Sequence, residues 1–216
     1  MTKKISWSVV AVLGLLTASC SGLDLKPATN PTARLQGQGF TVLPPPGSDW
    51  YIAEAVKDGI QFVKLNPGQT ADPDNAPHTF AVGVFPLPAN GTTGTADKDY
   101  PKAVENLLAE HFSQQRRILK NLTVSPFPSK QGLCVQYDSL QQRLRTEQNP
   151  TREYLEFSDH GIVCRYSPAS TNLIHGFYSQ RYHTGAPLEV PKATLEEAET
   201  FLKNIVLTKQ YLRQPA

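Results

Sequence analysis

The sequence predicts an α+β domain in which a mostly antiparallel sheet of about six to seven strands packs against two amphipathic helices. Several segments have the β-branched and aromatic composition of strands, and two others repeat apolar residues at the three- and four-residue steps of a helix. The strands fall into groups before and after the first helix instead of alternating with helices. Segregation of this kind is typical of α+β packing with an antiparallel sheet.

The first group of strands precedes the first helix. Strands are expected at residues 50–55, 60–65 and 79–86, and Asp58-Gly59 between the first two is typical of a hairpin turn. The helix is expected from Pro101 to about Leu122, where apolar residues recur at helical steps. Its solvent-facing side then carries a small basic cluster, Arg116, Arg117 and Lys120.

The second group of strands is expected at residues 133–144, 152–158, 162–166 and 173–182. Asp159-His160-Gly161 lies between two of them and is typical of a hairpin turn. A closing helix is expected over 195–206. Thr194, followed three residues later by Glu197, predicts a capping box at its start, in which each residue bonds the backbone of the other.

The first nineteen residues have the three parts of a secretory signal. Lys3 and Lys4 supply the positive start, residues 5–16 form an apolar run, and small residues lead to Cys20. The apolar run is much shorter than the roughly 20 residues of a bilayer-spanning helix. The mature chain is therefore not expected to span a membrane.

Residues 16–20, Leu-Thr-Ala-Ser-Cys, resemble the lipobox of bacterial lipoproteins. The resemblance implies that the sulfur of Cys20 carries diacylglycerol and that the chain is cut before it. Thr17 stands where Leu, Val or Ile is commonest, and the alternative is ordinary secretory cleavage that leaves a soluble periplasmic protein. Ser21 is not the Asp that marks inner-membrane retention in that family, which favours the outer membrane, facing the periplasm.

The domain organisation follows from this start. Residues 1–19 are expected to be the signal peptide, residues 20–39 a lipidated cysteine with a flexible tether rich in Ser, Thr, Pro and Gly, and residues 40–212 one α+β domain.

The cysteine count agrees with lipidation. Of the three cysteines, Cys20 is consumed by lipid, which leaves Cys134 and Cys164 as an even pair in an oxidising compartment. We expect these two to form a structural disulfide. There is no Cys-x-x-Cys spacing to indicate a redox site.

The charge balance argues against a nucleic-acid partner. The whole chain has 21 Lys and Arg against 19 Asp and Glu, and removal of residues 1–19 takes away Lys3 and Lys4 but no acidic residue, which leaves 19 of each. A formally neutral domain is therefore not expected to bind nucleic acid, whose phosphate backbones attract basic proteins.

No catalytic residue, metal site or cofactor is predicted. His175 and His183 lie eight residues apart in one expected strand, roughly 26 Å at strand rise, and so cannot share an ion. His78, His111 and His160 lack the close pairing of a zinc site, and residues 72–75 lack the later Gly and Glu of a calcium loop. Serine-hydrolase and P-loop motifs are also missing.

The remaining candidates are residues for contact with a partner. Tyr178, Arg181 and Tyr182 in the last strand, together with Arg143, have the composition enriched at protein interfaces and form the predicted contact patch. Structural packing is the alternative for these tyrosines, because strands favour them.

The order of elements resembles the PsbP-like sandwich over roughly residues 40–210, on topology alone. Members of that group mostly assist or bind envelope or membrane complexes. We therefore expect a non-enzymatic binding or accessory role, held to the membrane through lipid on Cys20 and directed to another envelope protein. The alternatives are a small envelope hydrolase or carbohydrate-acting enzyme with two carboxylates, or a carrier of a small apolar or lipid ligand.

Overall fold

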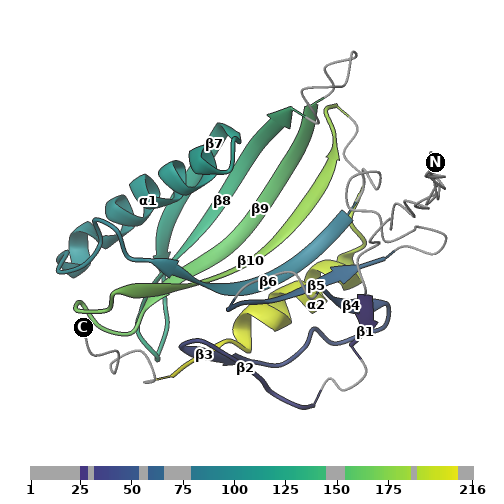
Figure 1. The fold of residues 1–216 in the computed structure, drawn as a ribbon, viewed down its shortest axis with the longest axis horizontal. Coiled ribbons are helices and arrows are strands. Elements are labelled where there is room, and N and C mark those ends of the chain that lie inside the picture. Colours follow the sequence, from purple (N-terminus) through teal and green to yellow (C-terminus); the bar gives the residue numbers. More distant parts are fainter. Residues whose placement is uncertain are drawn as a thin grey trace, which may run out of the picture.

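The computed structural model describes residues 25–28, 32–53, 58–65, 79–144, 154–185 and 189–208. Within them, eight strands form one antiparallel sheet in the order β1-β4-β5-β6-β10-β9-β8-β7, and three short strands form a second sheet in the order β11-β3-β2 (Figure 1). The strands of the large sheet are β1 (Leu25–Pro27), β4 (Trp50–Ala53), β5 (Ile60–Lys64), β6 (Thr79–Pro88), β7 (Ile118–Phe127), β8 (Leu133–Leu144), β9 (Tyr154–Arg165) and β10 (Asn172–His183). The other elements are β2 (Leu35–Gly37), β3 (Phe40–Val42), β11 (Val206–Leu207), the short 3-10 helix η1 (Asp97–Asp99), α1 (Tyr100–Gln114) and α2 (Lys192–Lys203).

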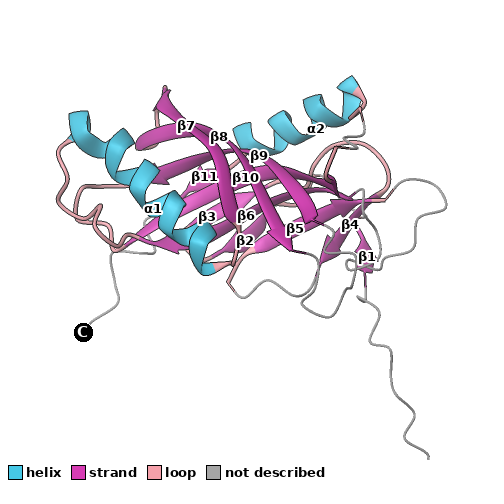
Figure 2. Cartoon of the chain, turned by 90° about the horizontal axis from the view of Figure 1, so that it is seen from above, coloured by secondary structure: helices cyan, strands magenta, loops and turns pink. Residues whose placement is uncertain are grey.

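The two helices cover opposite faces of the large sheet, as Figure 2 shows from above. On one face α1 buries Val104, Leu108 and Phe112 against strand residues that include Val135 and Val163. The core on the other face is built from α2, the small sheet and the alternate strand residues; it includes Phe40, Phe62, Val82, Ile162, Phe201 and Ile205. The predicted antiparallel sheet with two amphipathic helices is therefore confirmed, although the sheet has eight strands and not six to seven.

β9 corrects the prediction of a hairpin at Asp159-His160-Gly161. The strand runs without a break through these residues and is paired with β8 on one side and β10 on the other. Strand propensities differ between residues by only about 1 kcal/mol, so the low strand propensity of Asp159 and Gly161 is outweighed here by two hydrogen-bonded ladders. The predicted strands 152–158 and 162–166 are one strand.

β7 corrects the predicted end of the first helix. The helix stops at Gln114, Arg116 adopts a positive φ of 56°, and the chain turns back to pair with β8 along residues 118–127. The apolar residues at 118, 119 and 122 therefore belong to an edge strand, where Ile118 is 51% exposed. Their helical spacing misled because an edge strand with one open side tolerates irregular patterning.

The start of α2 also differs from prediction. Its N-cap is Pro191 and no side chain caps the helix, so the predicted capping box of Thr194 and Glu197 is wrong. Glu197 instead accepts hydrogen bonds from Trp50 Nε1 at 2.9 Å and from Lys64 Nζ. Glu197 thus joins the helix to β4 and β5. The helix ends at Lys203, and Val206 pairs with β3.

Some pairings lie within residues 20–39, where a tether is expected. β1 pairs with β4, and β2 pairs with β3. The paired part of the chain therefore extends to the N-terminal side of residue 40. Cys20 and the predicted signal peptide lie outside the described residues. Among the residues that are described, no helix is long and apolar enough to cross a membrane.

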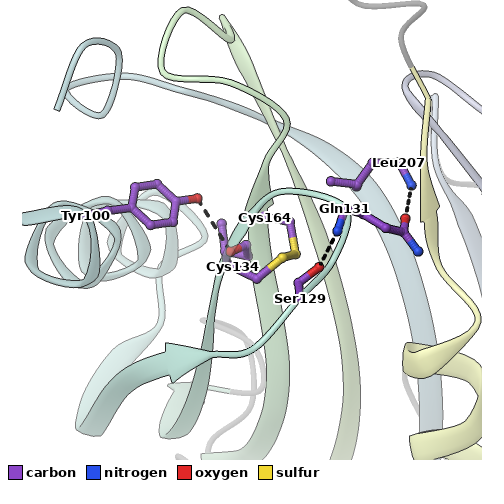
Figure 3. The surroundings of a disulfide bond; sticks show 7 residues. Tyr100, Ser129, Gln131, Cys134, Cys164 and Leu207 are labelled. Carbon is purple, nitrogen blue, oxygen red and sulfur yellow. Dashed lines mark hydrogen bonds between the residues drawn. A yellow bond between two sulfur atoms is a disulfide. The ribbon is translucent and has the colours of Figure 1, made fainter. Parts of the chain in front are cut away.

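A disulfide joins Cys134 of β8 to Cys164 of β9. The two residues are direct partners in the strand register, and both are buried on the α2 face (Figure 3). The loop before β8 is held from the same side, because Leu207 N of β11 donates to Gln131 Oε1 at 2.8 Å.

Candidate functional site

The register of the central strands aligns polar side chains on the α1 face of the sheet. Ser139 of β8 lies opposite Asp159 of β9, and Asp159 lies opposite Ser179 of β10. The next row along the strands places Gln141 opposite Phe157 and Phe157 opposite Arg181. Side chains two residues apart share a face, so these two rows form a polar area on the α1 face.

A pocket of about 340 Å³ lies over these rows at the C-terminal end of α1. We call it the Asp159 pocket. The residues that line it come from α1 and its C-terminal turn and from five strands of the sheet; they are Gln61, Ala81, Phe85, His111, Phe112, Gln115, Arg117, Tyr137, Arg143, Phe157, Asp159, His175, Phe177, Ser179 and Arg181. Its volume is at the lower end of the range for small-molecule sites.

Asp159 is buried, with 6% of its surface exposed. Its carboxylate accepts hydrogen bonds from Ser179 Oγ at 2.5 Å and from Gln141 Nε2 at 2.8 Å, and it lies 3.5 Å from Arg117 Nη1. Burial raises the pKa of the Asp159 carboxyl, while Arg117 and the two donors act in the opposite direction. This acid is therefore held in place by residues from the two neighbouring strands, β8 and β10, and from the turn after α1.

Arg117 and Arg143 lie against the ring of Phe157. The guanidinium carbon of Arg117 is 4.1 Å from the ring centroid and that of Arg143 is 5.7 Å away. Arg117 also donates to Gln141 Oε1 at 3.0 Å. Burial, and to a lesser degree the nearby positive charge of Arg143, lowers the pKa of Arg117, against the opposing effect of Asp159. Arg117 and Arg143 thus share one ring, and Arg117 also lies beside the Asp159 carboxylate.

His175 forms the aromatic end of the pocket. Its Nε2 is 2.7 Å from the hydroxyl of Tyr137, and its ring meets Phe85 edge to face with centroids 4.7 Å apart. The ring of His111, on α1, has its centroid 6.3 Å away. Burial lowers the pKa of His175 to about 3, and the positive charges of His111 and Arg117 add to the effect. The imidazole is therefore neutral at physiological pH.

Acidification is expected to destabilise the domain through His175. Its folded pKa of about 3 lies below the ordinary value of 6.5, so the unfolded chain binds the proton first, and stability is lost as pH falls from 6.5 toward 3. At pH 5 this amounts to about 2 kcal/mol. Denaturant unfolding at pH 7 and pH 5 would measure the loss.

His175→Gln should remove most of this pH dependence, whereas His183→Gln, near the end of the same strand, should keep it. The raised pKa of Asp159 has the opposite sign, since it adds stability as pH falls, and it is present in all three proteins. Equal slopes for wild type and His175→Gln would contradict the assignment.

Gly161 makes room for the ring of Tyr137 in the row next to Asp159. A Cβ at this position would lie 2.4 Å from the backbone oxygen of Gly176 and 2.7 Å from the Tyr137 ring. Backbone in a paired strand cannot move away easily, so Gly161→Ala should cost about 2–3 kcal/mol of unfolding free energy. Gly176→Ala would meet mainly the tip of Ile205 and should cost less. Thermal and urea unfolding of the two variants would compare them.

The predicted contact patch is divided between the two faces of the sheet. Arg143 and Arg181 line the Asp159 pocket. Tyr178 belongs to the core of the α2 face, where its ring stacks on His160 with centroids 4.9 Å apart. Tyr182 alternates to that same face and is buried. The structure therefore brings the two arginines together and separates them from the tyrosines.

The other candidate groups have structural surroundings. His160, expected in a turn, is in β9 and bonds Asp138 through Nδ1 at 2.7 Å. His175 and His183 are both in β10. Across the described ranges, no three His, Cys, Asp or Glu side chains are close enough together to hold a metal ion. His78 and residues 72–75 lie outside these ranges.

Sequence reasoning missed Asp159 and Arg117, which it assigned to a turn and to the exposed side of a helix. One signal was present: in residues 155–163 the alternate positions are Leu, Phe, Asp, Gly and Val, so the acid interrupts a core-facing series. An acid at a core-facing position needs a buried partner. The sequence does not show that this partner comes from the turn after α1.

Comparison with known proteins adds little to this geometry. No protein-family model matches the chain, and no curated protein matches it. Among solved structures, the Ran-binding protein Mog1p of Saccharomyces cerevisiae is similar with a TM-score of 0.47 and 13% identity, over 86% of this chain and 96% of that one. A Mog1 mutant has a TM-score of 0.47 and 12% identity, over 88% and 99% of the two chains.

The cyanobacterial PsbP (CyanoP) of Synechocystis is similar with a TM-score of 0.37 and 14% identity, over 82% of this chain and 92% of that one. At these TM-scores the likenesses carry no argument about function. The PsbP-like resemblance stays a prediction.

Proposed function

We propose that this protein is a lipid-anchored lipoprotein of the bacterial envelope with a non-enzymatic binding role, and that it engages a partner protein at the Asp159 pocket. The proposal rests on a pocket that is lined by charged and aromatic side chains. Among the described residues that line it, the single acid, Asp159, is already bound by neighbouring side chains. The carboxylate of Asp159 is engaged by Ser179, Gln141 and Arg117. A carboxylate with these partners positions the side chains around it.

The enzyme alternative requires two carboxylates, one to act as acid and one as base or nucleophile. Among the described residues that line the pocket, Asp159 is the only Asp or Glu. Ser179 donates its hydroxyl hydrogen to Asp159, and within the described part of the chain it makes no hydrogen bond to a histidine that could act as its base. The pocket therefore supports binding better than hydrolysis.

The apolar-carrier alternative requires an open apolar cavity. Both described core clusters are packed with side chains, and the Asp159 pocket is lined by arginines, glutamines and an aspartate as well as by rings. A purely apolar ligand would bury these polar groups without partners, at a cost of about 1–3 kcal/mol each.

Site-specific photocrosslinking in membranes would test the binding role. A benzophenone amino acid replacing Gln115, which is exposed and lines the pocket, should yield a discrete crosslinked adduct with the partner. The matched control replaces Thr200, which is exposed on α2 on the opposite side of the sheet, and should yield no such adduct. Equal patterns from both positions would refute the pocket as the binding site.

The anchor is tested separately. Metabolic labelling with palmitate should mark the wild-type protein and leave Cys20→Ser unlabelled, and fractionation should then move that variant from the membrane to the soluble fraction. Labelling that survives Cys20→Ser would overturn the anchor and favour the soluble periplasmic alternative.

A further inference from the structure

We propose that the Asp159 pocket accepts an organic carboxylate, whose charged group lies beside Arg143 and Arg117 and whose apolar body lies against the aromatic rings. The inference rests on the proposed binding role and names the chemistry that the pocket recognises. The carboxylate has two possible sources, a partner protein or a free carboxylic acid.

The first argument is charge. Arg117 shares Asp159 as its counter-ion, whereas Arg143 has no ion-pair partner among the described residues. The two guanidinium groups lie on the same phenylalanine ring and repel each other, which contributes to the lowered pKa of Arg117. His175 adds no positive charge at neutral pH, because burial lowers its pKa to about 3, and burial lowers the pKa of His111 as well. A bound anion would compensate the second guanidinium.

The second argument is hydrogen bonding. Two buried nitrogen atoms, Nε of Arg117 and Nδ1 of His175, have no hydrogen-bond partner among the described residues. The hydroxyl of Tyr137 is a protonated phenol, since burial raises its pKa well above the ordinary value. If this hydroxyl donates to Nε2 of His175, then Nδ1 carries the hydrogen and is a donor like Arg117 Nε. The residues that line the pocket thus have an excess of donors, which suits a ligand rich in acceptors.

The third argument is the shape of the groups. The planar fork of a guanidinium matches a carboxylate with two parallel hydrogen bonds. Phe85 and Phe177, whose ring centroids are 5.7 Å apart, line the pocket beside the neutral imidazole of His175. An inorganic anion would leave these rings unused, and a neutral apolar molecule would leave the arginines unused. A carboxylate attached to an aromatic or other apolar body uses both.

Ligand titration of the full-length protein in detergent, followed by saturation-transfer NMR, would test the proposal with four probes. N-acetylphenylalanine represents the end of a protein chain, benzoate a free acid, N-acetylphenylalanine amide the neutral match, and inorganic phosphate an anion without an apolar body. Both carboxylates should bind at least about tenfold more tightly than the amide and phosphate. Tighter binding of N-acetylphenylalanine than of benzoate indicates a protein source, and the reverse order indicates a free acid; either order supports the proposal.

Variants assign the binding to the pocket. Arg143→Gln should weaken carboxylate binding about tenfold and leave amide binding unchanged. Lys120→Gln, which removes one positive charge from the exposed edge strand β7, should change neither. If Arg143→Gln fails to fold, Gln115→Glu places a negative charge on the exposed rim and should weaken carboxylate binding in the same way.

Several results would overturn the inference. They are carboxylate binding no tighter than that of the amide, phosphate binding equal to that of the carboxylates, and full affinity retained in Arg143→Gln. If an adduct still forms at Gln115 in these cases, the binding role stands and only the carboxylate chemistry is wrong. A missing adduct at Gln115 would refute the binding role, whatever the probes do.

Discussion

Replacing Asp159 by alanine is expected to lower the free energy of unfolding by about 3–5 kcal/mol. The substitution leaves the guanidinium of Arg117 without its carboxylate in a site where the Arg117 side chain is only 21% exposed. It also leaves the donors of Ser179 and Gln141 without their acceptor. Urea unfolding monitored by circular dichroism would measure the loss.

Two further variants distinguish this explanation from a general loss of charge. Asp138→Ala removes an exposed aspartate from the adjacent strand β8 and should change stability by about 0.5 kcal/mol or less. The double variant Asp159→Leu with Arg117→Met removes both charges and should be more stable than Asp159→Ala. Equal losses for Asp159→Ala and Asp138→Ala would show that the buried network does not stabilise the fold.

Removing the disulfide with Cys134→Ala and Cys164→Ala together is expected to cost about 3–4 kcal/mol. The crosslink closes a loop with a sequence separation of 30 residues, and opening it gives the unfolded chain more conformations. Guanidinium unfolding of the double variant and of the wild type would show the difference.

Chemical reduction supplies the control for this second result. A reducing agent should destabilise the wild-type protein by a similar amount and leave the double variant unchanged, because the variant has no bond to reduce. If reduction has no effect on the wild type, the disulfide does not contribute to stability.

Much of the fold follows from local patterns. The apolar repeat on α1 and α2 and the composition of β4, β5, β6, β8 and β10 each place an element near its observed position. These elements are long or strongly patterned, so their own residues favour one structure. The short strands β1, β2, β3 and β11 have between two and three residues each. Segments of this length carry too little pattern to be recognised.

The candidate site is less accessible from sequence. Composition alone points to Arg143 and Arg181, and both line the pocket. For Asp159 and Arg117 a turn-forming triplet and a helical repeat are the stronger local signals, and these favour other structures. The contact between Arg117 and Asp159 joins residues 42 positions apart. No local pattern specifies such a pair.

The sequence by itself determines the class of this protein's fold, an antiparallel sheet packed with two amphipathic helices, because alternation and helical repeats are properties of each segment alone. Only the tertiary structure decides that Asp159 lies in the middle of a strand and not in a turn. Pairing with β8 and β10 on both sides outweighs the local preference of Asp159-His160-Gly161 for a turn. The same pairing brings Asp159 beside Ser179 and Gln141 and beneath Arg117, so the pocket exists only once distant strands have paired.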